Sequence, residues 1–154
     1  MAVIAIGSDD IGYELKEEIK RHLAVLGHEC EDFGAYSKEP VDYPDIALAV
    51  AEAITAGKYS RGILICGTGI GMSIAASKVP GVRAALCHDT YSAERARKSN
   101  DAQILTMGAR VIGPELAKKI VEVWLASEFT GGASARKVGK ITQIDEKYRK
   151  KEAG

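Results

Sequence analysis

Short unbroken apolar runs alternate along the chain with stripes of apolar residues at helical spacing. Short runs bounded by turn residues are typical of buried strands, and five of them predict strands at residues 3–6, 29–33, 62–66, 82–87 and 104–107. Leu15, Ile19, Leu23 and Leu26 recur at helical spacing and predict a helix that stops at Gly27. Further helices are predicted over residues 45–56, 72–77 and 91–98, after Pro114, and through Val138, Ile141 and Ile144.

Strands that alternate with helices are typical of a parallel sheet covered on both faces. Right-handed crossovers then give a doubly wound domain. The sequence therefore predicts an α/β fold: a single-domain, Rossmann-like three-layer sandwich with a five-stranded parallel sheet, spanning residues 1–154. The basic tail over residues 146–154 is expected to fray.

The charges of the chain balance, because 21 Lys and Arg stand against 21 Asp and Glu among 154 residues. Nucleic-acid and membrane partners favour a basic excess, so we expect neither, although a small anion can still bind locally. Cys30, Cys66 and Cys87 are odd in number and lack metal-ligand spacing, which predicts a cytoplasmic protein without a metal site. The apolar start reaches Asp9 too soon for a signal peptide, and no apolar run has membrane-spanning length.

Two loops follow strands at the carboxyl edge of the predicted sheet, where ligands bind in open α/β folds. They are residues 7–10 and residues 67–71. Glycines at 67, 69 and 71 let the second loop turn tightly and approach a ligand closely. The loop also opens a helix, and the free N–H groups at that helix start attract a phosphate or an oxyanion that forms during the reaction. Cys66 stands against those N–H groups, and the same field favours a thiolate that acts as a nucleophile or as a proton-abstracting base.

The residues of this loop leave one other interpretation open and exclude three. A buried, purely structural Cys66 is the plain alternative. A Cys-x5-Arg phosphatase loop is excluded by Met72, and the Gly-Lys-Ser/Thr of a Walker loop is absent. A dinucleotide fingerprint belongs after the first strand, where Gly7 stands alone. No cofactor is therefore predicted.

Further motifs accompany the Cys66 loop along nearly the whole chain. They are Gly7-Ser8-Asp9, Asp42-Tyr43-Pro44, Ser73-Ile74-Ala75-Ala76, Gly81-Val82-Arg83-Ala84, Asn100-Asp101-Ala102 and Gly108-Ala109-Arg110-Val111-Ile112-Gly113. With the run from Gly62 to Gly71, they make the chain similar to the ribose-5-phosphate isomerase B family, which is related to the galactose-6-phosphate isomerase subunits. The resemblance implies an enzyme that interconverts an aldose phosphate and its ketose without a metal.

The resemblance also implies roles for individual residues. Cys66 would move a proton between C1 and C2 of the substrate, and Thr68 would orient the substrate or relay a proton. The cis-enediolate would be stabilised by loop amides, those of Gly67, Thr68, Gly69, Ile70 and Gly71. Sugar hydroxyls would be held by Asp9, Tyr43 and Asn100, with Arg110 near the phosphate. The residues themselves leave plainer roles open: a helix N-cap for Asp9, packing beside Pro44 for Tyr43, and a turn for Asn100.

The family builds its site at a dimer interface, so the resemblance implies a homodimer or a dimer of dimers. The C-terminal segment of one subunit reaches its partner, and the last predicted helix would do so here.

The chain departs from the family pattern at several positions. Asp10 and Ser99 stand where the family usually has histidines, the second of which opens the sugar ring. Ala133-Ser134 replaces an arginine and a histidine, and Lys137, preceded by Arg136, replaces an arginine of the phosphate clamp. We therefore include Asp10, Arg136 and Lys137 among the candidate substrate-binding residues.

Two explanations of the departures compete. In one, His88 takes over as acid or phosphate ligand, and Arg136 and Lys137 still grip the phosphate. In the other, the substrate is a tetrose 4-phosphate, which cannot close a furanose ring and needs no ring-opening histidine. The segment from His88 to Arg95 resembles a branch of the family linked to erythritol breakdown.

Two hypotheses come from other classes. One is a non-catalytic sugar-phosphate-binding subunit that needs an unlike partner. The other is a cysteine hydrolase, which requires a histidine against the thiol, and only His22, His28 and His88 exist.

Overall fold

A computed structural model describes residues 3–153, with side chains described through residue 149. Residues 1, 2 and 154, which belong to the apolar start and the basic tail discussed above, lie outside the described residues. The strands are β1 (Val3–Ser8), β2 (Glu29–Asp32), β3 (Gly62–Cys66), β4 (Ala84–Leu86) and β5 (Ile104–Gly108). The helices are α1 (Tyr13–Val25), α2 (Tyr43–Thr55), α3 (Ile70–Ser77), α4 (Thr90–Lys98), α5 (Pro114–Ala126) and α6 (Ala133–Ala153).

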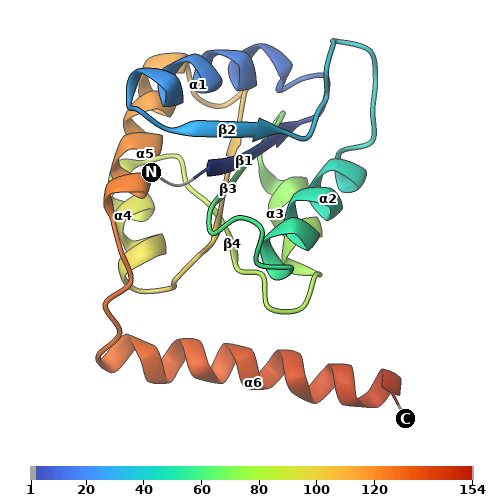
Figure 1. Cartoon of the computed structure of the whole chain (residues 1–154), viewed down its shortest axis with the longest axis vertical. Coiled ribbons are helices and arrows are strands. Elements are labelled where there is room, and N and C mark those ends of the chain that lie inside the picture. Colours follow the sequence, from blue (N-terminus) through green and yellow to red (C-terminus); the bar gives the residue numbers. More distant parts are fainter. Residues whose placement is uncertain (1–2, 154) are drawn as a thin grey trace.

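The strands form one sheet in the order β2-β1-β3-β5-β4, and every neighbouring pair is parallel. Helices α1, α4 and α5 cover one face, and α2 and α3 cover the other (Figure 1). Each face has its own apolar cluster, with Trp124 of α5 fully buried in the first and Met72 of α3 fully buried in the second. The predicted Rossmann-like three-layer sandwich with five parallel strands is confirmed.

Several predicted element bounds differ from the structure by one or two residues, and two of the differences have a clear physical reason. The strand expected over residues 82–87 is only β4, because the Val82 N–H donates to Val79 O in a turn and leaves Ala84 as the first paired residue. The helix expected from Asp45 begins earlier, at Tyr43, because Pro44 fits the first turn, where a backbone N–H has no helical partner.

The strand order reverses beside β1. The chain passes from β1 to β2 on one side and later enters β3 on the other side of β1. In open α/β sheets, the crevice at such a switch point is the usual ligand site, at the carboxyl ends of the strands. Asp9 and Cys66 lie at those ends of β1 and β3.

Helix α6 stands away from the sandwich (Figure 1). Val138 is nearly buried, and the Gly81 N–H donates to Asp145 Oδ2 over 2.8 Å, which anchors the helix near the start of β4. Ile141 and Ile144 are exposed. Within residues 3–153, no helix is long and apolar enough to cross a membrane.

Candidate active site

The ends of β1 and β3 lie against each other at the switch point. The Asp9 N–H donates to Ile65 O over 3.2 Å, which places the residue after β1 next to the end of β3. A Cβ added to Gly12 would lie 2.7 Å from Ile65 O, so the chain that enters α1 also touches this end. Asp9 and Cys66 are therefore brought to one place by backbone packing.

The loop of residues 67–71 sits directly on the end of β5. The Ala109 N–H donates to Cys66 O over 2.8 Å, and the Arg110 N–H donates to Gly67 O over 3.0 Å. A Cβ on Gly108 would lie 2.6 Å from the Thr68 backbone, so only glycine allows this approach. Gly69 has φ of +78°, and its carbonyl accepts a 2.9 Å hydrogen bond from the hydroxyl of Thr106.

The Cys66 sulfur is held at the opening of this loop. The thiol is almost buried, at 5% exposure, and Sγ accepts a 3.1 Å hydrogen bond from the Gly69 N–H. This bond places a backbone donor directly against the sulfur. Cys87 Sγ instead donates to Ala85 O over 3.8 Å, and burial raises the pKa of its thiol to about 11, which keeps it protonated at neutral pH.

Two outward-facing residues complete the loop. Thr68 Oγ1 accepts a 3.2 Å hydrogen bond from the Ile70 N–H, and both side chains are exposed. The loop therefore turns a hydroxyl and an apolar side chain outward, toward a ligand or a second molecule.

Asp9 is a buried carboxylate on the neighbouring loop. It is 6% exposed, and Oδ1 accepts a 2.9 Å hydrogen bond from the Gly12 N–H. Burial raises the pKa of Asp9, the Gly12 hydrogen bond opposes that shift, and the charge of Asp10 adds to it. The bond to Gly12 shows that Asp9 also stabilises the turn before α1, but the N-cap role left open for it is wrong, because Gly12 is the N-cap residue of α1 and no side chain caps it.

Tyr43 covers the far end of the glycine loop. A Cβ on Gly71 would lie 2.4 Å from Tyr43 Cε1, so the ring rests on the loop backbone. Asp10 Oδ1 accepts a 3.2 Å hydrogen bond from the Val41 N–H and ties the segment before Tyr43 to the end of β1. Tyr43 and Asp10 thus both border the site.

His88 and Arg110 approach from the β4 and β5 side. The Gly108 N–H donates to His88 Nε2 over 2.9 Å, so this nitrogen is an acceptor. Arg110 is exposed, and its Cδ would lie 3.8 Å from a Cβ on Gly67. Both residues lie beside the loop.

The contacts of the described residues do not favour a cysteine hydrolase. Cys66 Sγ receives its hydrogen bond from Gly69, while His88 accepts from Gly108. His22 Nε2 pairs with Glu122 Oε1 over 2.9 Å, which joins α1 to α5. No thiol–imidazole pair forms among residues 3–149.

Three candidate residues lie elsewhere in the chain. Asn100 follows α4 and borders an open cavity of about 530 Å³ at the β4 edge of the sheet. Arg136 and Lys137 are exposed on α6, the helix anchored near Gly81. Because α4 starts after the carboxyl end of β4 and returns to the amino ends of the strands, one copy of the chain does not bring Asn100 to the Cys66 loop.

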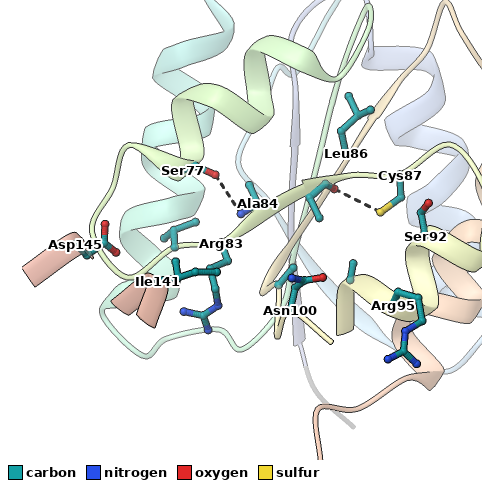
Figure 2. Close-up of a pocket in the computed structure, with 14 residues that line it drawn as sticks. Ser77, Arg83, Ala84, Leu86, Cys87, Ser92, Arg95, Asn100, Ile141 and Asp145 are labelled. Carbon is teal, nitrogen blue, oxygen red and sulfur yellow. Dashed lines mark hydrogen bonds between the residues drawn. The ribbon is translucent and has the colours of Figure 1, made fainter. Parts of the chain in front are cut away.

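This cavity contains two cations that the sequence analysis did not single out as site candidates, Arg83 and Arg95 (Figure 2). Arg95 donates to the hydroxyl of Ser99, at the position where the sequence departs from the family pattern. Arg83 belongs to the motif Gly81-Val82-Arg83-Ala84, one of those shared with the family, and this motif was the sequence signal that pointed to the cavity.

The sandwich with a thiol and a backbone amide at its switch point defines the class: a doubly wound α/β domain with a polar site at the carboxyl ends of its strands. The sequence model of the Ribose/Galactose Isomerase family matches residues 4–141, and the chain belongs to that family.

Relatives and a solved structure agree with this assignment. Ribose-5-P isomerase B of Listeria innocua is 56% identical, with 95% of this chain and 99% of the relative covered. D-erythrulose-4-phosphate isomerase of Pectobacterium atrosepticum is 57% identical, with 92% of this chain and 93% of the relative covered. The solved ribose-5-phosphate isomerase B of Clostridium thermocellum has a TM-score of 0.93 at 55% identity, with 95% of this chain and 99% of that chain covered.

Replacing Asp9 with asparagine separates the effect of its buried charge on stability from its role in turnover. Asp9→Asn keeps an acceptor for the Gly12 N–H and removes a buried charge, so we expect a gain of ~1 kcal/mol in unfolding free energy at neutral pH, the ordinary scale of one substitution. Turnover should fall by about 100-fold if Asp9 orients a substrate. Urea unfolding and steady-state kinetics measure the two effects.

The pH dependence of that gain follows from the sign of the shift. Because the folded-state pKa of Asp9 is raised, wild type is penalised above it and loses the penalty as the pH falls toward the ordinary value of 3.8. The advantage of Asp9→Asn should therefore shrink steadily with acidification. A variant that is less stable at neutral pH and fully active would contradict both assignments.

Proposed function

We propose that this protein is an aldose–ketose isomerase that works on a sugar phosphate through a cis-enediolate, without a metal. At the level of the family, the reaction is ribose 5-phosphate to ribulose 5-phosphate. The observation that carries the proposal is the 3.1 Å contact between Cys66 Sγ and the Gly69 N–H at the opening of the glycine loop. The relatives named above support the same reaction type.

The chemistry needs one base and one place for negative charge. With the open-chain aldose bound, the Cys66 thiolate removes the proton from C2, and the electron pair moves toward the C1 carbonyl oxygen. The enediolate oxygen meets the loop N–H groups, each worth about 3 kcal/mol in sites of this kind. The thiol then returns a proton to C1, and the C2 oxygen becomes the ketone.

Thr68 suits the accompanying proton movement between the two oxygens. Its hydroxyl is exposed and accepts from the Ile70 N–H, which orients its own proton outward. Asp9 and Tyr43 would hold sugar hydroxyls from the other side of the loop. Arg110 would face the phosphate, as a cation beside Gly67.

A second copy of the chain would complete the site, in a homodimer or a dimer of dimers. Asn100, Arg136 and Lys137 are the groups that it would supply. Two observations support this: these residues lie away from the Cys66 loop, and β4 is a three-residue edge strand. Large apolar side chains are exposed around that edge, namely Ile70, Ile74, Leu86, Tyr91, Ile141 and Ile144.

The unpaired thiols indicate the kind of compartment in which the protein would work. Cys30, Cys66 and Cys87 are all unpaired, and a working thiolate needs a reducing medium. We place the enzyme in the cytoplasm, with a small-molecule substrate and neither nucleic acid nor membrane as a partner.

A second candidate reaction is D-erythrulose 4-phosphate to D-erythrose 4-phosphate. Ser99 in place of the ring-opening histidine favours it, because this substrate has no furanose ring to open. Asp10 also favours a changed substrate, since a carboxylate repels phosphate where an imidazolium attracts it. The relative from Pectobacterium atrosepticum carries this activity in its name.

Removing the thiol tests the proposed base. Cys66→Ala should lower kcat by at least about 1,000-fold without unfolding the protein, because the base is lost while the apolar packing of β3 remains. Cys87→Ala, which removes another buried thiol, should keep wild-type kcat. A coupled isomerase assay with circular dichroism checks both variants.

Two results of that assay would contradict the proposal. Full activity of Cys66→Ala would remove the base assignment. No turnover of any aldose phosphate by the pure wild-type protein would favour the non-catalytic subunit that needs an unlike partner.

A substrate series decides between the two reactions. If Ser99 marks a substrate without a ring, kcat/KM for erythrose 4-phosphate should exceed that for ribose 5-phosphate by about 10-fold or more, which is about 1.4 kcal/mol of discrimination. Restoring a ring-opening group with Ser99→His should narrow this ratio. A wild-type preference for ribose 5-phosphate would remove the tetrose interpretation.

A further inference from the structure

Asn100 is an exposed amide on a firmly held loop. None of the described residues forms a hydrogen bond with its side chain, which is free to meet a ligand. The next residue, Asp101, has φ of +48°, a conformation that residues other than glycine rarely adopt. Such a conformation persists only where the surroundings hold it, and it concentrates at functional sites.

Two arginines hold Asp101. Arg83 Nε donates to Asp101 O over 2.9 Å, and Arg83 Nη2 donates to Asp101 Oδ2 over 3.3 Å. Arg97 Nη1 donates to Asp101 Oδ1 over 3.1 Å and to Ala102 O over 2.9 Å. The backbone that directly follows Asn100 is thus fixed by two guanidinium groups. One comes from Arg83, just before β4, and the other from Arg97, near the end of α4.

The same Arg83 is linked to α6. Its backbone N–H donates to Gln103 Oε1, and Gln103 Nε2 donates to Gly81 O, each over 2.8 Å, while its guanidinium Nη1 donates to Gly81 O over 3.4 Å. The Gly81 N–H donates to Asp145 Oδ2, also over 2.8 Å. Figure 2 shows Arg83 between Asn100 on one side and Ile141 and Asp145 of α6 on the other.

Arg83 itself is poorly placed to bind a substrate. Its side chain is only 19% exposed, and its donors are directed to Asp101 O, Asp101 Oδ2 and, at 3.4 Å, Gly81 O. A substrate phosphate would have to displace these partners. The residue therefore acts through the groups that it holds.

We propose that Arg83 is a positioning residue, which fixes Asn100 and α6 as one unit that completes the Cys66 site of a second copy. The inference rests on the proposed function, and it adds the part of the chain that keeps Asn100, Arg136 and Lys137 in register. Its chemistry is the fork of a guanidinium on one carbonyl and one carboxylate, which a lysine reproduces only in part.

Kinetics of Arg83→Ala give the first test. With Asn100 released, kcat/KM should fall by about 100-fold, the scale of a small misplacement of a binding group. The kcat/KM of Arg83→Lys should lie between those of wild type and Arg83→Ala. Lys98→Ala, which breaks an exposed ion pair with Glu94 on the same α4, should keep wild-type kcat/KM.

A mixed dimer gives the decisive test. One chain carries Arg83→Ala, the other carries Cys66→Ala, and different tags allow purification of the mixed species. If Arg83 serves the partner's site, one of the two sites combines an intact Cys66 with an intact Arg83, and about half of wild-type activity returns. If Arg83 serves only its own chain, both sites stay defective, and absent recovery overturns the proposal.

A second variant covers the case in which Arg83→Ala fails to fold. Asp145→Ala removes the acceptor that links Gly81 to α6 and should raise KM severalfold with a smaller change in kcat, because Arg136 and Lys137 lose register. The same mixed-dimer recovery is expected, and unchanged KM would overturn the link to α6. Wild-type activity is measured first, so failure of the proposed function itself is seen separately, as absent turnover by the unmodified protein.

Discussion

The close approach of the glycine loop to the end of β5 is the contact on which the rest of the site depends. A Cβ on Gly108 would lie 2.6 Å from Thr68, and a Cβ on Gly69 would lie 2.8 Å from Met107, so both positions exclude side chains. This approach lets the Gly69 N–H reach the Cys66 sulfur and lets the chain after β5 bind Cys66 O and Gly67 O. Tyr43, Asp9 and His88 then border a loop that is already fixed.

The arrangement explains why the candidate base is a thiol rather than a carboxylate. The Gly69 amide offers a donor at the end of β3, and the Cys66 sulfur is held against it in a position that is almost closed to water. The nearby carboxylate, Asp9, is disfavoured as an anion by its burial, and its pKa is raised for that reason. The two acidic groups therefore suit different tasks.

Much of the fold could be predicted from the pattern of apolar residues, because parallel strands buried on both faces leave unmistakable runs such as Ile63 to Ile65. The shortened β4 could not, because the turn at Val82 depends on a local hydrogen bond. Gly71 under the ring of Tyr43 and Gly108 against His88 join residues far apart in sequence, and no local pattern encodes such contacts.

The location of Asn100 is the most instructive case. The resemblance to the family placed this residue with the substrate, but the path of α4 carries it to the amino ends of the strands, away from the Cys66 loop. In the proposed function a second copy of the chain reconciles the two, and the interactions of Arg83 and Asp101 then position Asn100 for the partner's site. The departures at Asp10 and Ser99 concern which sugar phosphate is bound, and they leave the loop around Cys66 unchanged.

Solvent deuterium incorporation tests the central claim, proton transfer by Cys66, most directly. The ketose phosphate is converted in deuterated water, and the aldose product is analysed at C2 by NMR. A thiol that exchanges with solvent before it returns the proton should deliver deuterium to C2 in the wild-type reaction. Cys66→Ala should lose this incorporation together with turnover. Deuterium delivered to C2 by Cys66→Ala at the wild-type rate would show that another group moves the proton and would contradict the account.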